Sequence, residues 1–600
     1  MINVWYLITI PKISIIHNYR LFFFIGAMKD NLKPTNHSIK KTDLETRINT
    51  MELPEQLNLV LTTPWEKRFE IITSSRMAKQ IVANMPVEEL FWTIKATGVQ
   101  DSSILLGLST PEQLQFIFDL DWWRKDLLRA DKIAAWLLVM FELSEDSLKQ
   151  WLRWILHQDP WLFPAVLNEF IKVIKRPDDM DIQEAKDLLP PFTLDNVYFI
   201  DFKKKKLAPL FIRLITAILE IDSGRYRDIF ETMLWETPSH NLETAYRFRC
   251  GRIGDFGIPS YYDSLDIYTP LKPEQMHIID LDDPILKALP VNYDMPPFVP
   301  TLYVTDFPVL YEAFGRLAGS PLMERIIREA TGVANKILMA DLVDLDDPER
   351  LQASLKKAFS MINLGIEHLS ARLNKQPSQI LATHYLEEIA RLASALLLPA
   401  GTKARQILKD KRFNIIPHHL KQVVEEAAKR PSMLFIPEEG QAGFVATFSD
   451  LQILERLVNE ASSWHKVINL LAPYFDKLKT GIDWEKTNML APEELAVDSA
   501  LATMVANLLL DANFNTTPID KKRLGLLYDK IRNFNRQELT KYMTEMLGPI
   551  SSDEQGGLSR LELQQVIIPR ILEIFEDFLL EGDHIKNEPK YVKNLLTYTE

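Results

Sequence analysis

The chain has 600 residues, 46% of them hydrophobic, and its 69 Lys and Arg against 82 Asp and Glu give a net charge of −13. This composition excludes disordered, fibrous and collagen-like proteins, and the negative charge argues against double-stranded nucleic acid as a partner. Only 20 residues are glycine and one is cysteine, which argues against glycine-dependent nucleotide-binding sheets and excludes disulfide scaffolds and cysteine-based zinc fingers. We expect a mainly α-helical, cytoplasmic protein without a cofactor.

Residues 1–50 differ in character from the rest of the sequence. Their apolar patches are interrupted, for example by Pro11 and Lys12, and none reaches the roughly 18 residues that a bilayer-spanning helix needs. The segment also lacks the unbroken apolar stretch of a signal peptide. We expect an atypical extension that is disordered or, if translation starts at Met28 or Met51, not translated. The alternative is a segment that touches a membrane surface, and no transmembrane segment is expected.

One helical pattern recurs between Pro86 and Ile174, within a unit that we place at residues 51–177. Apolar residues recur at i, i+3 and i+4, and sets begin at Leu114, Ile133, Leu148 and Phe163, which are 19, 15 and 15 residues apart. This spacing leaves room for about three helical turns and a short connection. We predict a helical-repeat, superhelical unit of stacked amphipathic helices.

Capping residues mark the starts of these helices. Thr110 and Gln113 have the spacing of a capping box, with Pro111 at the first helical position. Trp122 and Trp123 follow that helix, and adjacent side chains of a regular element do not both face inward. One of the two is therefore a candidate surface anchor, and the alternative is that both pack beneath a loop.

Residues 178–308 are interpreted as a central mixed segment. A short strand is predicted at 196–200 and an apolar helix at 210–221. Six prolines between Asp280 and Pro308 predict a proline-rich linker.

Residues 309–590 are predicted to form a C-terminal helical domain. Helices are expected over 321–342, 347–373 and 379–398, and a last one over 558–580. Two short apolar runs that flank a Glu-Glu-Gly-Gln-Ala-Gly turn predict a small β-hairpin at 432–448.

An Arg/Gly segment in the central region is the strongest candidate for a binding site. Guanidinium groups beside glycines, whose backbone N–H groups are accessible, are suited to an anion such as a phosphate or carboxylate. The candidate ligand-binding residues are Arg247, Arg249, Arg252, Asp255, Tyr261 and Tyr262, near Gly251, Gly254 and Gly257. The alternative is a bent loop between helices, in which the arginines pair with local acids such as Glu243 and Asp255.

No metal site is expected, although one arrangement resembles a carboxylate and imidazole site. Glu367 and His368 lie on one predicted helix, and His384 and Glu388 on the next. Antiparallel packing of the two helices would bring these groups together. Surface pairing of His and Glu on each helix is the alternative, because the spacing is not that of known carboxylate-bridged proteins.

Several motifs resemble a family of bacterial proteins of unknown function, from about residue 54 over most of the chain. They are Met-Pro-Val-Glu-Glu-Leu at 85–90, Ser-Thr-Pro-Glu-Gln-Leu at 109–114, Asp-Leu-Asp-Trp-Trp at 119–123, Ala-Tyr-Arg-Phe-Arg at 245–249 and Gly-Ile-Pro at 257–259. The resemblance implies no reaction and no catalytic residues. The N-terminal third is also similar to the cytosolic helical superhelix of magnesium transporters, through its Pro-Glu-x-Leu helix starts.

Two functions follow from these patterns. The sequence lacks the Gly-x-Ser-x-Gly, Walker, His-Glu-x-x-His and Gly-x-Gly-x-x-Gly motifs. Stacked helices offer extended surfaces, so we expect a protein-interaction or scaffolding protein with a protein partner. The alternative is an enzyme or binding protein for an anionic small molecule at residues 247–255.

Overall fold

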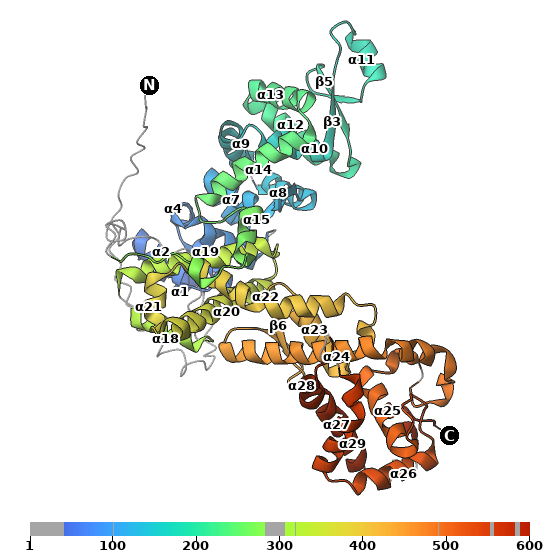
Figure 1. Ribbon diagram of the computed structural model, residues 1–600. Coiled ribbons are helices and arrows are strands. Elements are labelled where there is room, and N and C mark those ends of the chain that lie inside the picture. The colour runs from blue at the N-terminus through green and yellow to red at the C-terminus, as the bar shows by residue number, and fades with distance from the viewer. Residues whose placement is uncertain are drawn as a thin grey trace.

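The computed structural model describes residues 41–99, 101–143, 145–281, 306–317, 320–489, 491–551, 557–581 and 589–599 (Figure 1). The protein is mainly α-helical, as predicted, and its sheets are small and antiparallel. Most of the predicted extension 1–50 and of the proline-rich linker lies outside the described residues. None of the described helices combines the length and the apolar character that crossing a membrane requires.

The N-terminal half is a succession of short helices. They are α1 (Lys41–Ile48), α2 (Leu53–Thr62), α3 (Trp65–Ser74), α4 (Ala78–Asn84), α5 (Val87–Thr97), α6 (Ser103–Leu108), α7 (Pro111–Asp121), α8 (Ala130–Leu143), α9 (Glu145–Gln158), α10 (Leu162–Phe170), α11 (Ile182–Leu188), α12 (Ala208–Ile221), α13 (Ser223–Trp235), α14 (Pro238–Gly254) and α15 (Tyr261–Ser264). The capping box at the start of α7 is present, because Thr110 Oγ1 accepts from Gln113 N at 3.3 Å and Gln113 Oε1 accepts from Thr110 N at 2.9 Å. The Gln113 amide also donates to the carbonyls of Val82 and Met85, so this cap anchors α7 to the end of α4.

Trp122 and Trp123 are both buried, so neither is a surface anchor and the alternative, in which both pack inside, is what the structure has; the expectation that two adjacent side chains cannot both face inward is wrong. The reason is that α7 ends at Asp121 and Trp123 begins strand β1 (Trp123–Arg124), which pairs with β2 (Leu127–Leu128). The change of backbone direction between the two residues sends both indoles into the core. Trp122 stacks on Phe118, with ring centroids 4.6 Å apart.

A three-stranded antiparallel sheet follows α10. Its order is β3 (Ile171–Lys175), β5 (Tyr198–Phe202) and β4 (Phe192–Thr193). β5 overlaps the strand predicted at 196–200, whereas β3 was not predicted. β3 follows α10 without a turn residue between them, so the sequence carries no signal for the change from helix to strand.

The C-terminal half contains longer helices. They are α18 (Pro308–Leu317), α19 (Pro321–Ala340), α20 (Pro348–Leu373), α21 (Pro377–Thr383), α22 (Leu386–Leu408), α23 (His418–Ala427), α24 (Phe448–Gly481), α25 (Val497–Asp511), α26 (Lys521–Arg532), α27 (Arg536–Leu547), α28 (Arg560–Glu562) and α29 (Ile568–Leu580). The helix predicted over 379–398 is in fact two, because α21 ends before His384 and α22 starts at Leu386. The predicted hairpin is confirmed: β6 (Met433–Ile436) pairs with β7 (Gln441–Phe444).

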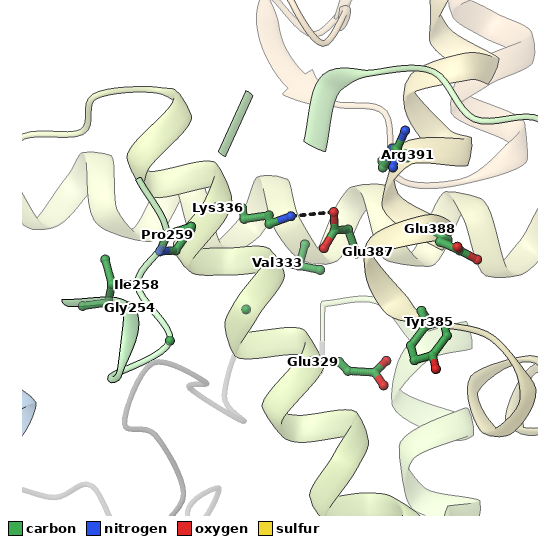
Figure 2. A pocket seen from close by; sticks show the side chains of 12 residues that line it. Gly254, Ile258, Pro259, Glu329, Val333, Lys336, Tyr385, Glu387, Glu388 and Arg391 are labelled. Carbon is green, nitrogen blue, oxygen red and sulfur yellow. Dashed lines mark hydrogen bonds and ion pairs between the residues drawn. The ribbon is translucent and has the colours of Figure 1, made fainter. Parts of the chain in front are cut away.

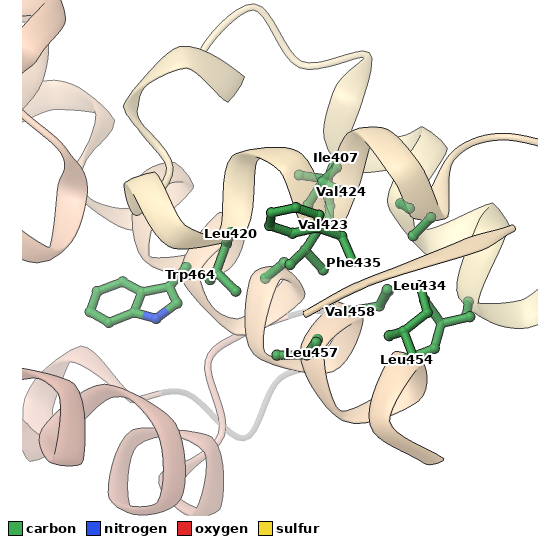
Figure 3. Close-up of a cluster of buried hydrophobic side chains, with 14 of the residues drawn as sticks. Ile407, Leu420, Val423, Val424, Leu434, Phe435, Leu454, Leu457, Val458 and Trp464 are labelled. Carbon is green, nitrogen blue, oxygen red and sulfur yellow. The ribbon is translucent and has the colours of Figure 1, made fainter. Parts of the chain in front are cut away.

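Two buried hydrophobic clusters organise the described residues. The N-terminal core draws its buried residues from 48–258, and the C-terminal core draws its own from 267–596. Figure 3 shows part of the C-terminal core, where Leu420, Phe435 and Val458 from α23, β6 and α24 lie together. The predicted domain boundaries at 177/178 and 308/309 stay predictions.

Close packing of α20 on α22 depends on Gly365. A Cβ atom at this position would lie 2.4 Å from the carbonyl oxygen of Ile389 and 2.6 Å from its Cγ2. The missing side chain therefore lets the two helix backbones approach each other.

The two halves are joined by an ionic link at the turn between α19 and α20. Asp346 in this turn accepts from Lys95 Nζ of α5 at 2.5 Å and also pairs with Lys132 of α8. Lys95 contacts Asp121 Oδ1 as well, at 2.7 Å. Met339 at the end of α19 and Leu345 in the turn pack against the N-terminal core.

Candidate functional site

The Arg/Gly segment is the end of α14 and not a loop. α14 starts at the N-cap residue Thr237, whose Oγ1 accepts from His240 N at 3.3 Å, and runs through Gly251 to Gly254. The N–H of Gly257 donates to the Gly254 carbonyl at 2.9 Å, so it closes the end of the helix. Successive helical residues are rotated by about 100°, which points the three arginines in different directions.

Arg252 lies between two buried aspartates, and we call Asp119, Asp159 and Arg252 the Arg252 cluster. Arg252 Nε and Nη2 donate to the two carboxylate oxygens of Asp119 at 2.6 and 2.9 Å, and Nη1 donates to Asp159 at 2.7 Å. Asp159 also accepts the N–H groups of Trp161 and Leu162 at the start of α10. The cluster therefore ties α14 to α7 and α10.

The charges in this cluster depend on one another. Burial raises the pKa of Asp159, and the nearby charge of Arg252 opposes that rise. Burial also disfavours the charged form of Arg252, but the hydrogen bond and charge of Asp119, together with Asp159, raise its pKa overall. An external anion at Arg252 would have to compete with two internal carboxylates.

Arg247 and Arg249 have different surroundings again. Arg247 is exposed and pairs with Glu243 one turn earlier in α14, as the bent-loop alternative proposed. Arg249 is buried, its Nε donates to the carbonyl of Asp119 at 2.6 Å, and its guanidinium lies 5.7 Å from the Trp123 ring. Burial lowers the pKa of Arg249. Its Nη1 has no hydrogen-bond partner within the described part of the chain.

The other predicted ligand-binding residues lie on the surface. Asp255 is exposed at the C-cap of α14. Tyr262 donates its hydroxyl to Asp126 at 3.0 Å, and Lys125 Nζ lies 4.8 Å above the Tyr261 ring. The structure thus does not bring the three arginines together, and an anion site at 247–255 stays a prediction.

The four metal candidates are not brought together either. Glu367 accepts the N–H of Phe448 at 2.7 Å, and His384 lies beyond the end of α21 with its ring 3.0 Å from Thr383 Oγ1. Burial lowers the pKa of His368, and Glu388 pairs with His277. Among the residues that the structure describes, no three His, Cys, Asp or Glu side chains form a group that could hold a metal ion.

A cavity of about 540 Å³ lies between the end of α14 and the helices α19 and α22, and we call it the junction pocket (Figure 2). It is lined by Gly254, Gly257, Ile258, Pro259, Glu329, Gly332, Val333, Lys336, Tyr385, Glu387, Glu388 and Arg391. The segment from α14 comes from the end of the N-terminal core, whereas α19 and α22 belong to the C-terminal core. The pocket is therefore formed where the two cores meet.

Glu329 on α19 anchors one wall of the junction pocket. Its Oε2 accepts the N–H of Leu386, the first residue of α22, at 3.0 Å, and its Oε1 lies 3.6 Å from Arg325 Nε. Burial raises the pKa of Glu329, although the Leu386 hydrogen bond and Arg325 oppose the rise. The carboxyl group thus holds the start of α22 against α19.

The remaining charged groups of the pocket belong to α19 and α22. Lys336 Nζ donates to Glu387 at 2.5 Å, as Figure 2 shows. Glu388 accepts from the backbone N and the ring Nδ1 of His277 at 2.8 and 2.5 Å. Arg391 uses its Nε to donate to the Thr269 carbonyl at 3.2 Å, and no carboxylate pairs with it among the described residues.

Sequence reasoning missed Glu329, Lys336 and Arg391. Each looks like an ordinary charged residue of an amphipathic helix, and only the packing of α19 against α22 brings them to one cavity. Gly332 was the available signal, because it is a glycine in the interior of the long helix α19 that no close packing requires: a Cβ there would meet no atom within 4 Å.

Comparisons with known proteins identify only a family. No curated protein and no solved structure matches the chain significantly. The similarity of the N-terminal third to magnesium transporters therefore has no support from these comparisons. The family of unknown function DUF6178 matches residues 45–598, which is most of the chain. The protein therefore belongs to this family.

Proposed function

We propose that the protein binds a small charged molecule in the junction pocket. The observation that carries this proposal is the cavity of about 540 Å³ at the contact between the two cores. Small-molecule sites typically have about 300–1,000 Å³ and occur preferentially at such contacts.

The single cysteine and the absence of a membrane-crossing helix among the described residues support a cytoplasmic location.

The ligand that fits this lining carries both an acidic and a basic or hydroxyl group. Arg391 offers N–H donors that no carboxylate of the described residues neutralises, and these suit a carboxylate or phosphate. Glu329, whose pKa is raised by burial, suits an amine or a hydroxyl. The anionic ligand expected from the sequence is retained here in part: the Arg/Gly segment contributes Gly254 and Gly257 to the wall, but not its arginines.

Filling the cavity tests this function. Gly332→Phe places a large side chain at a pocket wall where a Cβ meets no atom within 4 Å. Gly525→Phe is the matched control, because Gly525 is a helical glycine in α26 with equally open surroundings and does not line the pocket. Both variants and the wild type are screened by thermal shift against amino acids, organic acids, amines and phosphorylated metabolites.

We expect one class of compound to stabilise the wild type and Gly525→Phe but not Gly332→Phe. A compound present at a free concentration of 100 times its Kd raises the free energy of unfolding by about 2.7 kcal/mol. Equal stabilisation of all three proteins, or no stabilising compound for the wild type, would count against the proposal.

A protein-interaction function is the second candidate, and the specific observation in its favour is at the far end of the N-terminal half. Trp235 at the end of α13 is 83% exposed, and Leu188 of α11 is 68% exposed. Exposed tryptophans are enriched at protein interfaces. Replacement of Trp235 by Ser is expected to remove a stoichiometric partner from affinity purifications, and purification of a partner-free monomer with the wild type argues against this function.

A further inference from the structure

In a second, smaller cavity, all of the charged lining residues are positive. It measures about 190 Å³, and we call it the basic pocket. Its charged residues are Arg405 of α22 and, just after α23, Lys429 and Arg430. No carboxylate lines it among the described residues.

Neither arginine of the basic pocket has an acidic partner among the residues that the structure describes. In these residues Arg405 donates to neutral oxygens, the carbonyl of Ala428 and the hydroxyl of Thr402, both at 3.2 Å. Arg430 forms no ion pair within the described ranges, whereas Lys429 pairs with Glu426 at 2.6 Å. Burial and the nearby positive charge of Arg430 lower the pKa of Arg405. Two like charges at one cavity are stabilised by an anion between them.

The rest of the lining supplies hydroxyl groups and apolar surface. Ser432 is buried and lies so close to α22 that a Cβ at Gly401 would be 2.5 Å from its Oγ. Ser394 also lines the cavity, and Leu397 and Pro431 add apolar contacts. The Ser432 hydroxyl can donate to a phosphate oxygen, and the apolar wall suits the organic part of a ligand.

We propose that the basic pocket binds the phosphate group of a small phosphate monoester. Two guanidinium groups without a carboxylate partner among the described residues favour a dianion over a monoanion, and the guanidinium fork matches the geometry of phosphate oxygens. The volume of about 190 Å³ suits a small molecule.

The basic pocket is separate from the junction pocket. Residues 267–271 cross α22 between them, where Leu271 N donates to the Arg391 carbonyl at 3.3 Å and Ser394 Oγ donates to the Ile267 carbonyl at 3.3 Å. The two proposals therefore stand on different side chains, and either can fail alone.

The test is calorimetric titration of the full chain with inorganic phosphate and with glycerol 3-phosphate, at ionic strength held constant with chloride. The variants are Arg405→Gln, Arg430→Gln and the double variant. Arg456→Gln is the matched control, since Arg456 is an exposed arginine of α24 outside the pocket. Unfolding midpoints are recorded for each variant, because Arg405 also holds the end of α23 through Ala428.

We expect each single variant to weaken binding by at least about tenfold, and the double variant to abolish it, because each removes a charge-assisted hydrogen bond. Arg456→Gln should bind like the wild type. If glycerol 3-phosphate binds more tightly than inorganic phosphate, the ligand is a phosphorylated metabolite. If the two bind equally, the ligand is free phosphate.

Absence of binding to the wild type, or unchanged binding by the double variant, overturns the proposal. If Arg405→Gln unfolds, Arg430→Gln and the charge reversal Arg430→Glu decide the outcome, since Arg430 has no ion pair to lose among the described residues.

Discussion

The C-terminal ends of α14 and α22 both combine arginine with glycine, but their surroundings are opposite. At α14, Arg252 is neutralised by two buried aspartates, and a Cβ at Gly251 would meet no atom within 4 Å. At α22, Arg405 faces a cavity without a carboxylate among the described residues, and a Cβ at Gly401 would collide with Ser432. The comparison teaches that an arginine is available to a ligand when its neighbours in space leave its charge unpaired, whatever its neighbours in sequence.

The largest expected effect concerns the end of α14, where the charge of Arg252 is already paired. Replacement of Arg252 by Met leaves Asp119 and Asp159, whose side chains are almost fully buried, without their cation. Loss of one partner of a buried ion pair costs about 3–5 kcal/mol. We expect the midpoint of chemical unfolding of the N-terminal half, followed by tryptophan fluorescence, to fall accordingly.

Arg247→Met is the control for that variant, because the pair of Arg247 with Glu243 is exposed and contributes about 0.5 kcal/mol or less. Equal losses in the two variants would show that the Arg252 cluster is not a structural tie and would reopen Arg252 as a ligand-binding group.

The glycines provide the next test. Gly365→Ala in α20 forces a Cβ against the carbonyl of Ile389 in α22, and overpacking of this kind costs about 1–3 kcal/mol. Gly251→Ala in α14 meets open space and should raise stability by up to about 1 kcal/mol through helix propensity. Urea unfolding of both variants measures the difference. A loss of stability in Gly251→Ala would mean that the Arg/Gly segment needs its glycines after all.

The smallest effect concerns Glu329, which joins α19 to the start of α22. Its pKa is raised in the folded protein by burial, so the folded state holds the proton more tightly than the unfolded state does. The stabilisation from this proton is complete below the ordinary glutamate pKa of 4.5 and is lost as the pH rises through the folded pKa.

We therefore expect Glu329→Gln to gain stability relative to the wild type as the pH is raised above that range, measured as unfolding midpoints from about pH 4 to about pH 8. Parallel pH profiles of the two proteins would contradict the raised pKa.

Local features of the fold could be predicted from the sequence, because local spacing determines them. The capping box of Thr110 and Gln113 and the hairpin of β6 and β7 are such features. The surface-anchor candidate among Trp122 and Trp123 was wrong because the backbone changes from helix to strand between them. This change depends on the pairing of β1 with β2, which helical periodicity does not report.

The candidate sites could not be predicted, because their residues meet only in the folded chain. The Arg252 cluster joins α7, the α9–α10 connection and α14, so the local acids expected to neutralise Arg252 were the wrong ones: Asp119 and Asp159 do so instead of Asp255. In the junction pocket, Glu329 and Arg391 come from helices whose patterns are those of ordinary amphipathic helices. Local sequence patterns do not show which distant helices pack against each other.

The link between Asp346 and the lysines of α5 and α8 has a consequence for the order of synthesis. Every fully buried residue of the N-terminal core precedes residue 259, so this core is complete on the ribosome before Asp346 exists. The roughly 90 residues up to Leu351, which packs on the same core, take about 5–20 s to translate. During that interval the apolar side chains of the N-terminal core that Met339, Leu345 and Leu351 later contact have no cover from this part of the chain.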